Sequence, residues 1–513
     1  MNKNKTTARS FSVLTGITLF EKAIAFVFEA IIAATLGAGI VTDAYFTAAE
    51  FFTLVDSAFL SSLTVIVINR FSYHITQEGA EKAFASLSNI LSCYLPLMTL
   101  TSGLICLFAA PISYVIAPGY DAAARLLLIR CTRLLSVIPV VVCVMSVELA
   151  VLRQKKHFGI TGLKSLFISV IGIVALVLFG RSDAKNADVL VFAYIISNIA
   201  YCVLTTISIR KYGRLRLCKP SFNEEIKITV RKVLPLMVSY GIARVSLMVG
   251  KIVASLLGEG HVSNLTYAHT LYRVVAAIFI TNLATILLTD FNEMLSQKNY
   301  QAVQRKIRAV VPIMTMLLIP ITVVSVVCSR DIVKIVYERG NFTSESTVIV
   351  ANVLMIYALN FIPTMIHGIY NQVLYANGDT KTPMWIAFVT ITVNLSISLL
   401  LSRVIGLPGV AVGTLISSFV GVLLCSFAVK RFLPGYRGCY SVRFLLCCVV
   451  STVFCVAAAI LVELLHLPAL WAFVLSTLVC SVSFLCVLLL LREKTAVGVV
   501  RQAVEIAKKL IKR

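Results

Sequence analysis

The sequence contains few charged residues for its length. Asp, Glu, Lys and Arg make up 13% of the 513 residues, whereas about 25% is usual for a soluble protein. Hydrophobic residues make up 59%, and only 23 residues are acidic against 46 that are basic. This composition excludes a soluble globular protein and predicts an all-α integral membrane protein.

Features of the common enzyme classes are also missing. The sequence has no Gly-x-x-x-x-Gly-Lys-Ser/Thr phosphate loop and no segment polar enough to form a nucleotide-binding domain. The 14 cysteines are scattered, mostly through apolar segments, without metal-ligand spacing. We therefore expect a protein that is not an enzyme, has no ATPase motif, and binds neither a metal nor an organic cofactor.

Apolar runs long enough to cross a bilayer recur along the chain and are separated by short polar loops. They predict about 14 transmembrane helices. The predicted spans are residues 11–36, 44–69, 86–111, 123–152, 158–180, 187–209, 233–257, 264–290, 309–329, 345–375, 384–403, 408–429, 443–465 and 469–491.

Basic residues gather in alternate loops. They are densest in residues 210–232 and in the tail at 492–513, which also has the apolar stripe of an amphipathic helix. This positive-inside bias predicts a multi-pass protein with both termini in the cytoplasm. The net charge of +23 is then an orientation signal, with anionic membrane lipids and not nucleic acid as its partners.

An internal repeat divides the chain. Residues 32–43 align with residues 253–264 without a gap, at an offset of 221, and the same offset places Gly119 on Gly340. Six spans per repeat give both halves the same orientation in the membrane, as in transporters with parallel repeats. The predicted parts are an N-terminal lobe (1–209), a basic linker (210–232), a C-terminal lobe (233–430), two additional helices (431–491) and the amphipathic tail (492–513).

Charged residues lie inside several of the apolar spans. Each costs roughly 2.5–3.5 kcal/mol at the bilayer centre, so such residues normally face a hydrated cavity or a partner. We expect the cations to hold an anionic headgroup, and the acids to orient sugar hydroxyls, bind a coupling cation (Na⁺ or H⁺) or gate the lobes. Alternatively, the acids of one lobe form ion pairs with the bases of the other that close the lobes and have no role in ligand binding. The candidate residues are Lys22, Glu29, Asp43, Glu50, Asp56, Arg244, Lys251, His269 and Arg273.

Five segments, taken in order, resemble one family of transporters. They are GAGIVTDAYF (37–46), APGY (117–120), YERGNFT (337–343), YANGDTKTP (375–383) and GLPGVA (406–411). Together with the 6+6+2 arrangement of spans, they are similar to the MurJ/MviN lipid II flippases. That family belongs to the multidrug/oligosaccharidyl-lipid/polysaccharide (MOP) exporter superfamily, which includes the MATE transporters.

The resemblance implies a flippase of the bacterial cytoplasmic membrane that moves a polyprenyl-linked glycan, lipid II, for peptidoglycan synthesis by alternating access. It implies a central cavity for the headgroup and a groove for the lipid tail along the last two helices, with cell-envelope synthesis proteins as partners. A cation gradient or the membrane potential would supply the energy.

Carried onto this sequence, the family pattern places its first basic cavity residue at Lys22 and its acid opening span 2 at Asp43. The sequence departs from the pattern elsewhere. A second arginine falls on Phe28 beside Glu29, an arginine pair falls on Asp56 and Ser57, and an Asp-Arg pair falls on His269 and Thr270.

Three alternative functions stay open on the sequence. A flippase for another polyprenyl-linked polysaccharide fits the same features. A cation-coupled MATE-like drug exporter fits the acidic first lobe, although a soluble drug has no need of the last two helices. A scaffold without transport activity would use the charges only as latches.

Overall fold

The computed structural model describes residues 20–155, 157–180, 186–433, 435–436, 438–465, 467–493, 495–498 and 501. All regular secondary structure in these ranges is helical. Most of the predicted amphipathic tail lies outside the described residues. The chain forms two compact units, which we describe separately: unit 1 is Met1–Thr266 with Arg339–Phe342, and unit 2 is Tyr267–Glu338 with Thr343–Arg513.

The helices agree with the predicted spans. Among the described residues, nine helices are long and apolar enough to cross a membrane, and a pair bent by 43°, α15 (Ser344–Leu359) and α16 (Phe361–Ala376), can form a tenth. The other four predicted spans also fold as helices, but each is short, charged or interrupted. They are residues 20–36, α8 (Lys164–Phe179), α10 (Glu224–Ser255) and α11 (His261–Ala276) continuing through a π-helical turn into α12 (Asn282–Ser296).

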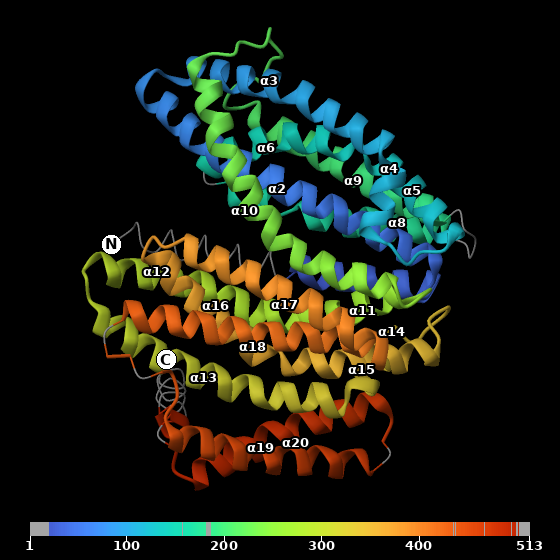
Figure 1. Ribbon diagram of the computed structural model, residues 1–513, viewed down its shortest axis with the longest axis vertical. Helices are drawn as coiled ribbons and strands as arrows, with labels where there is room; N and C mark the ends of the chain where they lie inside the picture. Colours follow the sequence, from blue (N-terminus) through green and yellow to red (C-terminus); the bar gives the residue numbers. More distant parts are fainter. Residues whose placement is uncertain are drawn as a thin grey trace, which may run out of the picture. The chain divides into compact units, whose positions relative to one another are not determined.

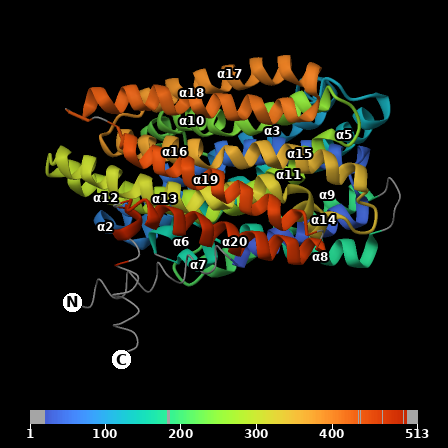
Figure 2. The same ribbon diagram turned by 90° about the horizontal axis from the view of Figure 1, so that it is seen from below.

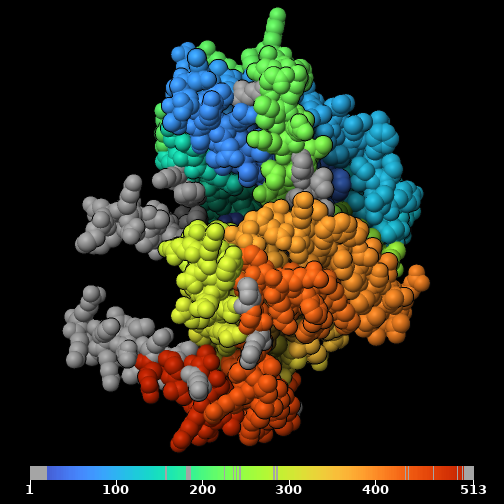
Figure 3. All heavy atoms as spheres, turned by 60° about the vertical axis from the view of Figure 1, so that its left-hand side comes forward, coloured from blue at the N-terminus to red at the C-terminus, as the bar shows by residue number. Residues whose placement is uncertain are grey.

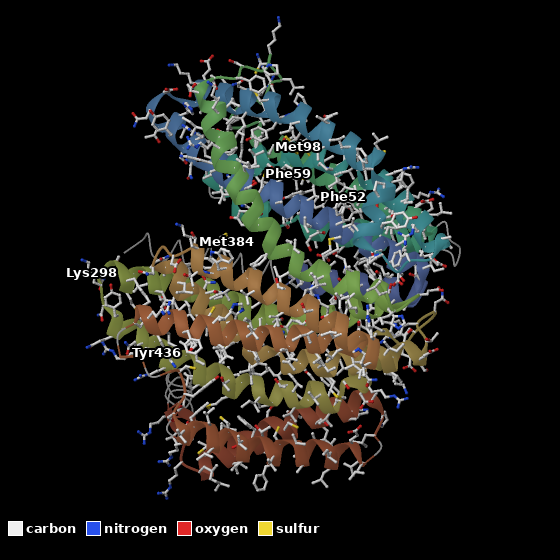
Figure 4. The ribbon with its side chains drawn as sticks, viewed as in Figure 1. Phe52, Phe59, Met98, Lys298, Met384 and Tyr436 are labelled. Carbon is white, nitrogen blue, oxygen red and sulfur yellow. The ribbon has the colours of Figure 1, made fainter. Side chains whose placement is uncertain are left out.

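Unit 1 is built around the long helix α2 (Ile40–Gln77), against which α3, α5, α6, α9 and α10 pack (Figure 1). Most buried side chains of α2 are apolar, among them Phe52, which is fully buried and labelled in Figure 4, but Asp43 and Asp56 are buried as well. The remaining helices of unit 1 are α3 (Ala80–Leu107), α4 (Ala109–Ile116), α5 (Ala122–Leu135), α6 (Ile138–Gln154), α7 (Phe158–Thr161) and α9 (Asn186–Ile209).

The basic segment between α9 and α10 has no regular secondary structure over residues 213–223 and lies along α3. Ser88 and Ser92 accept hydrogen bonds from the backbone N–H groups of Arg216 (3.1 Å) and Cys218 (2.9 Å). Asn89 forms a pair of hydrogen bonds with the backbone of Ser221, at 2.9 and 3.0 Å. Three polar residues on one face of α3 therefore hold this connection in place.

Unit 2 contains α12, α15, α16 and most of α11. In Figures 1 and 2, α17 and α18 run side by side, as do α19 and α20. The other helices are α13 (Tyr300–Val327), α14 (Ser329–Tyr337), α17 (Lys381–Ile405), α18 (Leu407–Phe432), α19 (Val442–Glu463) and α20 (Ala469–Leu490).

The last two helices pack on α13 through an apolar core rich in cysteine, which includes Cys328, Cys448, Cys455 and Cys480. As expected from the sequence, these thiols are free and serve as small buried apolar groups. The outer faces of α17 to α20, orange to red in Figure 3, carry many exposed apolar side chains. Such faces are typical of helices that contact lipid.

The repeat is visible in the helix lengths. Helices α3 and α13 each contain 28 residues, and each is followed after one residue by a short helix, α4 or α14. Helix α10 is an exception to this correspondence: it is the first helix of the second repeat, but it belongs to compact unit 1. The predicted lobe boundaries at 209 and 233 stay a prediction.

Candidate functional site at the paired turns of unit 1

Asp43 joins the beginnings of two helices that are equivalent in the repeat. It lies in the first turn of α2, is 1% exposed, and accepts hydrogen bonds from the backbone N–H groups of Gly260 and Ser263, both at 2.7 Å. The Ser263 hydroxyl donates a third at 2.5 Å. Asp43 therefore caps the N-terminus of α11, where unpaired N–H groups and the helix dipole favour a negative charge.

The segments that precede α2 and α11, residues 37–39 and 256–260, are the paired turns, and one loop docks beside each of them. Gly340, with φ of +59°, lies so close to helix 20–36 that a Cβ would approach the Ala34 carbonyl oxygen to 2.2 Å. Its repeat equivalent Gly119 lies against the end of α10, where a Cβ would approach the Ser255 carbonyl oxygen to 2.3 Å. Only glycine fits at either contact. Asn341 strengthens one of them by donating from its backbone to Ala34, at 2.9 Å.

A cavity of about 130 Å³ lies beside these turns, and its lining includes Asp43, Tyr120, Asp121 and Glu259. The Tyr120 hydroxyl is 2.7 Å from the Thr47 hydroxyl. Burial, together with the nearby Asp43 carboxylate, raises the pKa of Tyr120. The Tyr120 phenol therefore stays protonated and keeps its hydrogen bond with the Thr47 hydroxyl.

Lys251 of α10 and Glu50 of α2 form an ion pair. Lys251 Nζ lies 3.1 Å from Glu50 Oε2, and the side chains are 11% and 17% exposed. The ammonium group also donates to the backbone carbonyl of Phe46 at 3.0 Å. The structure thus joins two of the predicted site residues, and it pairs an acid of the first repeat with a base of the second.

Asp56 also has a cationic partner, but it is one that the sequence analysis missed. Lys164, at the start of α8, donates to Asp56 Oδ2. Both groups are largely buried, so each removes much of the cost of burying the other. Asp56 is therefore neutralised within unit 1.

The other predicted residues divide between the units. In unit 1, Lys22 is exposed, whereas Glu29 and Arg244 are half-buried. In unit 2, Arg273 is exposed, and the His269 ring packs beside the rings of Tyr272 and Tyr357. Convergence of the four predicted cations on one chamber stays a prediction.

Two further residues had a sequence signal that could have identified them. Ser263 is the repeat equivalent of Thr42, so the sequence repeat already linked these two positions, whose hydroxyl groups are in contact. Glu148 lies in the apolar segment Ala122–Gln154 and is a charged residue of the same kind as those selected.

The sequence and structure can now be compared with known proteins. The sequence model of the family described as Lipid II flippase MurJ matches residues 32–486. The probable lipid II flippase MurJ of Rickettsia prowazekii (strain Madrid E) is 26% identical over 459 residues, 87% of this chain and 89% of that protein. Its counterpart in Rhizobium meliloti (strain 1021) is 25% identical over 427 residues, 81% and 79% of the two chains.

The chain belongs to the MurJ family of lipid II flippases. The resemblance predicted from the five motifs is thereby confirmed, and the chain is a membrane transporter. A solved structure described as "Lipid II flippase MurJ, inward closed conformation" matches with a TM-score of 0.79 at 18% identity, covering 94% of this chain and 99% of that one. An inward-facing multidrug resistance MATE transporter of the MOP superfamily matches with a TM-score of 0.66 at 14% identity, covering 80% and 95%. These matches confirm the predicted fold class.

Within the MurJ family pattern, the position of the second arginine in span 1 falls on Phe28. In this chain Phe28 is buried and packs on Gly172 of α8, where a Cβ would meet its ring at 2.4 Å. The large and the small side chain are complementary, so this position supports helix packing and carries no charge.

Proposed function

We propose that this chain moves lipid II, a polyprenyl-linked glycan, from the inner to the outer leaflet of the bacterial cytoplasmic membrane by alternating access. The tail of such a lipid is too apolar to leave the bilayer, and its sugar–pyrophosphate head is too polar to cross it unaided. The protein therefore has to shield only the head.

The observation that carries the proposal is the ion pair between Lys251 of α10 and Glu50 of α2, a helix apolar and long enough to span a membrane. A pyrophosphate group is a stronger anionic partner for an ammonium group than one carboxylate, because it offers more charge and more acceptor atoms. Headgroup binding would take Lys251 from Glu50 and so separate α10 from α2. Arg244 and Lys22 of unit 1 are further candidates for the anionic head, and Arg273 and His269 remain predicted contributors.

The paired turns around Asp43 would close the outer side of the protein during the transport cycle. With the termini in the cytoplasm, as the positive-inside bias predicts, these turns lie at the outer end of the helices. Their hydrogen bonds would keep the outer side closed while the head enters from the cytoplasm. Opening would expose Asp43 to water and break its three hydrogen bonds in one step.

We further propose that no ATP is consumed. Driving force would come from a coupling cation, Na⁺ or H⁺, or from the membrane potential. Moving one unit charge through the whole potential is worth about 2.3 kcal/mol per 100 mV, enough to bias such a conformational change. The apolar outer faces of α19 and α20 would contact the lipid tail during transport. Anionic lipids would contact the basic linker.

A reconstituted system tests the proposal. Purified protein in liposomes that carry fluorescent lipid II should translocate the headgroup without ATP, as measured by loss of protection from a membrane-impermeant quencher. A second polyprenyl-linked glycan and a cationic dye are assayed in parallel. Transport of only the other glycan, or of only the dye, would replace lipid II as the substrate; absence of all three would refute the transport function.

A further inference from the structure

A second acidic group lies deep inside unit 1, away from the paired turns and from the Glu50–Lys251 ion pair. Glu148 of α6 is 1% exposed and belongs to the apolar segment Ala122–Gln154, which is long enough to span a membrane. It precedes the end of α6 by six residues, which is about 9 Å of helix. In the proposed orientation this end faces the cytoplasm.

The carboxyl group of Glu148 forms its hydrogen bonds with side chains of the neighbouring helix α9. Its Oε2 lies 2.5 Å from Thr205 Oγ1, and its Oε1 lies 2.5 Å from Thr206 Oγ1. Cys202 Sγ approaches Oε2 at 3.9 Å. Among the residues that the structure describes, no cation forms an ion pair with Glu148, in contrast to Glu50 and Asp56.

Counting the protons shows that this network suits both forms of the acid. Each threonine hydroxyl has one proton, and each lies 2.9 Å from a second acceptor, the backbone carbonyl of Cys202. If both hydroxyls donate to Glu148, the carboxylate is ionised. If one hydroxyl turns to the Cys202 carbonyl, its oxygen can accept a hydrogen bond from a protonated Glu148. One proton can thus enter or leave while every donor keeps an acceptor.

Other titratable groups near Glu148 are few. Cys202 and Tyr201, both on α9, face it, and Tyr201 is itself buried. Tyr201 in turn lies near Arg153 of α6, Glu21 of helix 20–36 and Asp56 of α2. Asp56 is paired with Lys164, whereas the hydrogen-bond partners of Glu148 among the described residues are the neutral groups of Thr205, Thr206 and Cys202.

The helix that carries Glu148 is hydrogen-bonded to α2, the helix that carries Asp43 and Glu50. Two residues before it, the Ser146 carbonyl accepts a hydrogen bond from Thr64 of α2, at 3.1 Å. Helix α6 packs against both α2 and α9. A change in the Glu148–threonine bonds therefore acts on the contact between α6 and α9 and, through α6, on α2, which begins at the paired turns.

We infer that Glu148, with Thr205 and Thr206, forms a proton-binding site that couples the transport cycle to the proton gradient. The site binds one proton from water on one side of the membrane and releases it to water on the other side. No other covalent bond is made or broken. This inference rests on the proposed function for the coupling, but proton binding itself can be measured without transport.

Infrared difference spectroscopy of the protein in lipid tests proton binding directly. We expect a C=O stretching band of a buried protonated carboxyl group that grows as the pH falls. It should be missing in Glu148→Gln, and its midpoint should move in Thr206→Val. Glu224→Gln, which changes an exposed acid paired with Lys227, should leave the band unchanged. A titrating band that persists in Glu148→Gln, or its absence in the wild type, would overturn the site.

Transport in liposomes tests the coupling. With the membrane potential clamped, a gradient of one pH unit should change the lipid II flipping rate of the wild type by up to about tenfold, the factor that one coupled proton supplies. Glu148→Gln should flip lipid II at a rate that does not respond to the gradient. An unchanged gradient response in this variant overturns the coupling, whereas absence of flipping in the wild type refutes the proposed function and leaves the spectroscopic result valid.

Discussion

The hydroxyl groups of Thr42 and Ser263 lie 2.8 Å apart, and these residues are separated by 221 positions, the length of the repeat. Each is the third residue of its helix, α2 or α11. The two residues are therefore equivalent in the repeat, and their contact joins the equivalent turns. Asp43 and the docking glycines lie at the same turns.

The docking glycine at position 119 is expected to be essential for closure. Gly119→Ala places a methyl group 2.3 Å from the Ser255 carbonyl oxygen, and overpacking of this kind costs about 1–3 kcal/mol. We predict a flipping rate reduced by about tenfold or more. Gly103→Ala is the matched control, because a Cβ added there would meet no described atom within 4 Å outside the adjoining backbone of its own helix. Equal rates in the two variants would contradict the role of the turn.

Substitutions in the Glu50–Lys251 ion pair test whether Lys251 binds the headgroup or only holds α10 against α2. Lys251→Ala should abolish headgroup translocation in liposomes while the protein still inserts and folds. The double reversal Glu50→Lys with Lys251→Glu keeps an ion pair but moves the cation to α2. If Lys251 binds the headgroup, the double variant stays inactive; recovery of flipping would show that the pair is only a latch.

Asp43 should stabilise the closed outer side more than a simple helix cap does. Asp43→Asn can accept on only one atom and presents an NH₂ group to backbone donors, so one buried N–H loses its acceptor, at about 1–3 kcal/mol. Asp121→Asn is the control, since Asp121 caps α5 through a single bond to the Ala124 N–H at 2.8 Å. Thermal unfolding should show the larger loss for Asp43→Asn, and the reverse order would refute its special role.

The pair of Asp56 and Lys164 should be structural. Lys164→Ala leaves a buried carboxylate without its cation, which costs about 3–5 kcal/mol. Lys227→Ala, which removes an exposed partner of Glu224, should change stability by about 1 kcal/mol or less. Both are measured as free energies of unfolding in detergent. A mild effect of Lys164→Ala would indicate that water reaches Asp56.

Much of the fold could be predicted from the sequence, because a bilayer allows few structures. Apolar runs must be helical there, so the spans and the repeat followed from hydrophobicity and from the shared glycines. The partners of the charged residues did not follow. Lys164 lies inside predicted span 5 (158–180) and Glu148 inside predicted span 4 (123–152), but nothing in the sequence pairs Lys164 with Asp56 or Glu148 with the threonines of α9. Which helix faces which depends on side-chain packing, and hydrophobicity alone does not specify it.

The contact between Thr42 and Ser263 also constrains which side chains a duplicated protein can keep at its centre. Where two equivalent positions of a repeat meet, each side chain contacts its own counterpart, so it must be complementary to itself, as in a symmetric dimer. A hydroxyl group satisfies this condition because it both donates and accepts, whereas two carboxylates or two ammonium groups would repel. A half-length chain with a hydroxyl here could pair with a second copy of itself before the two were joined into one polypeptide.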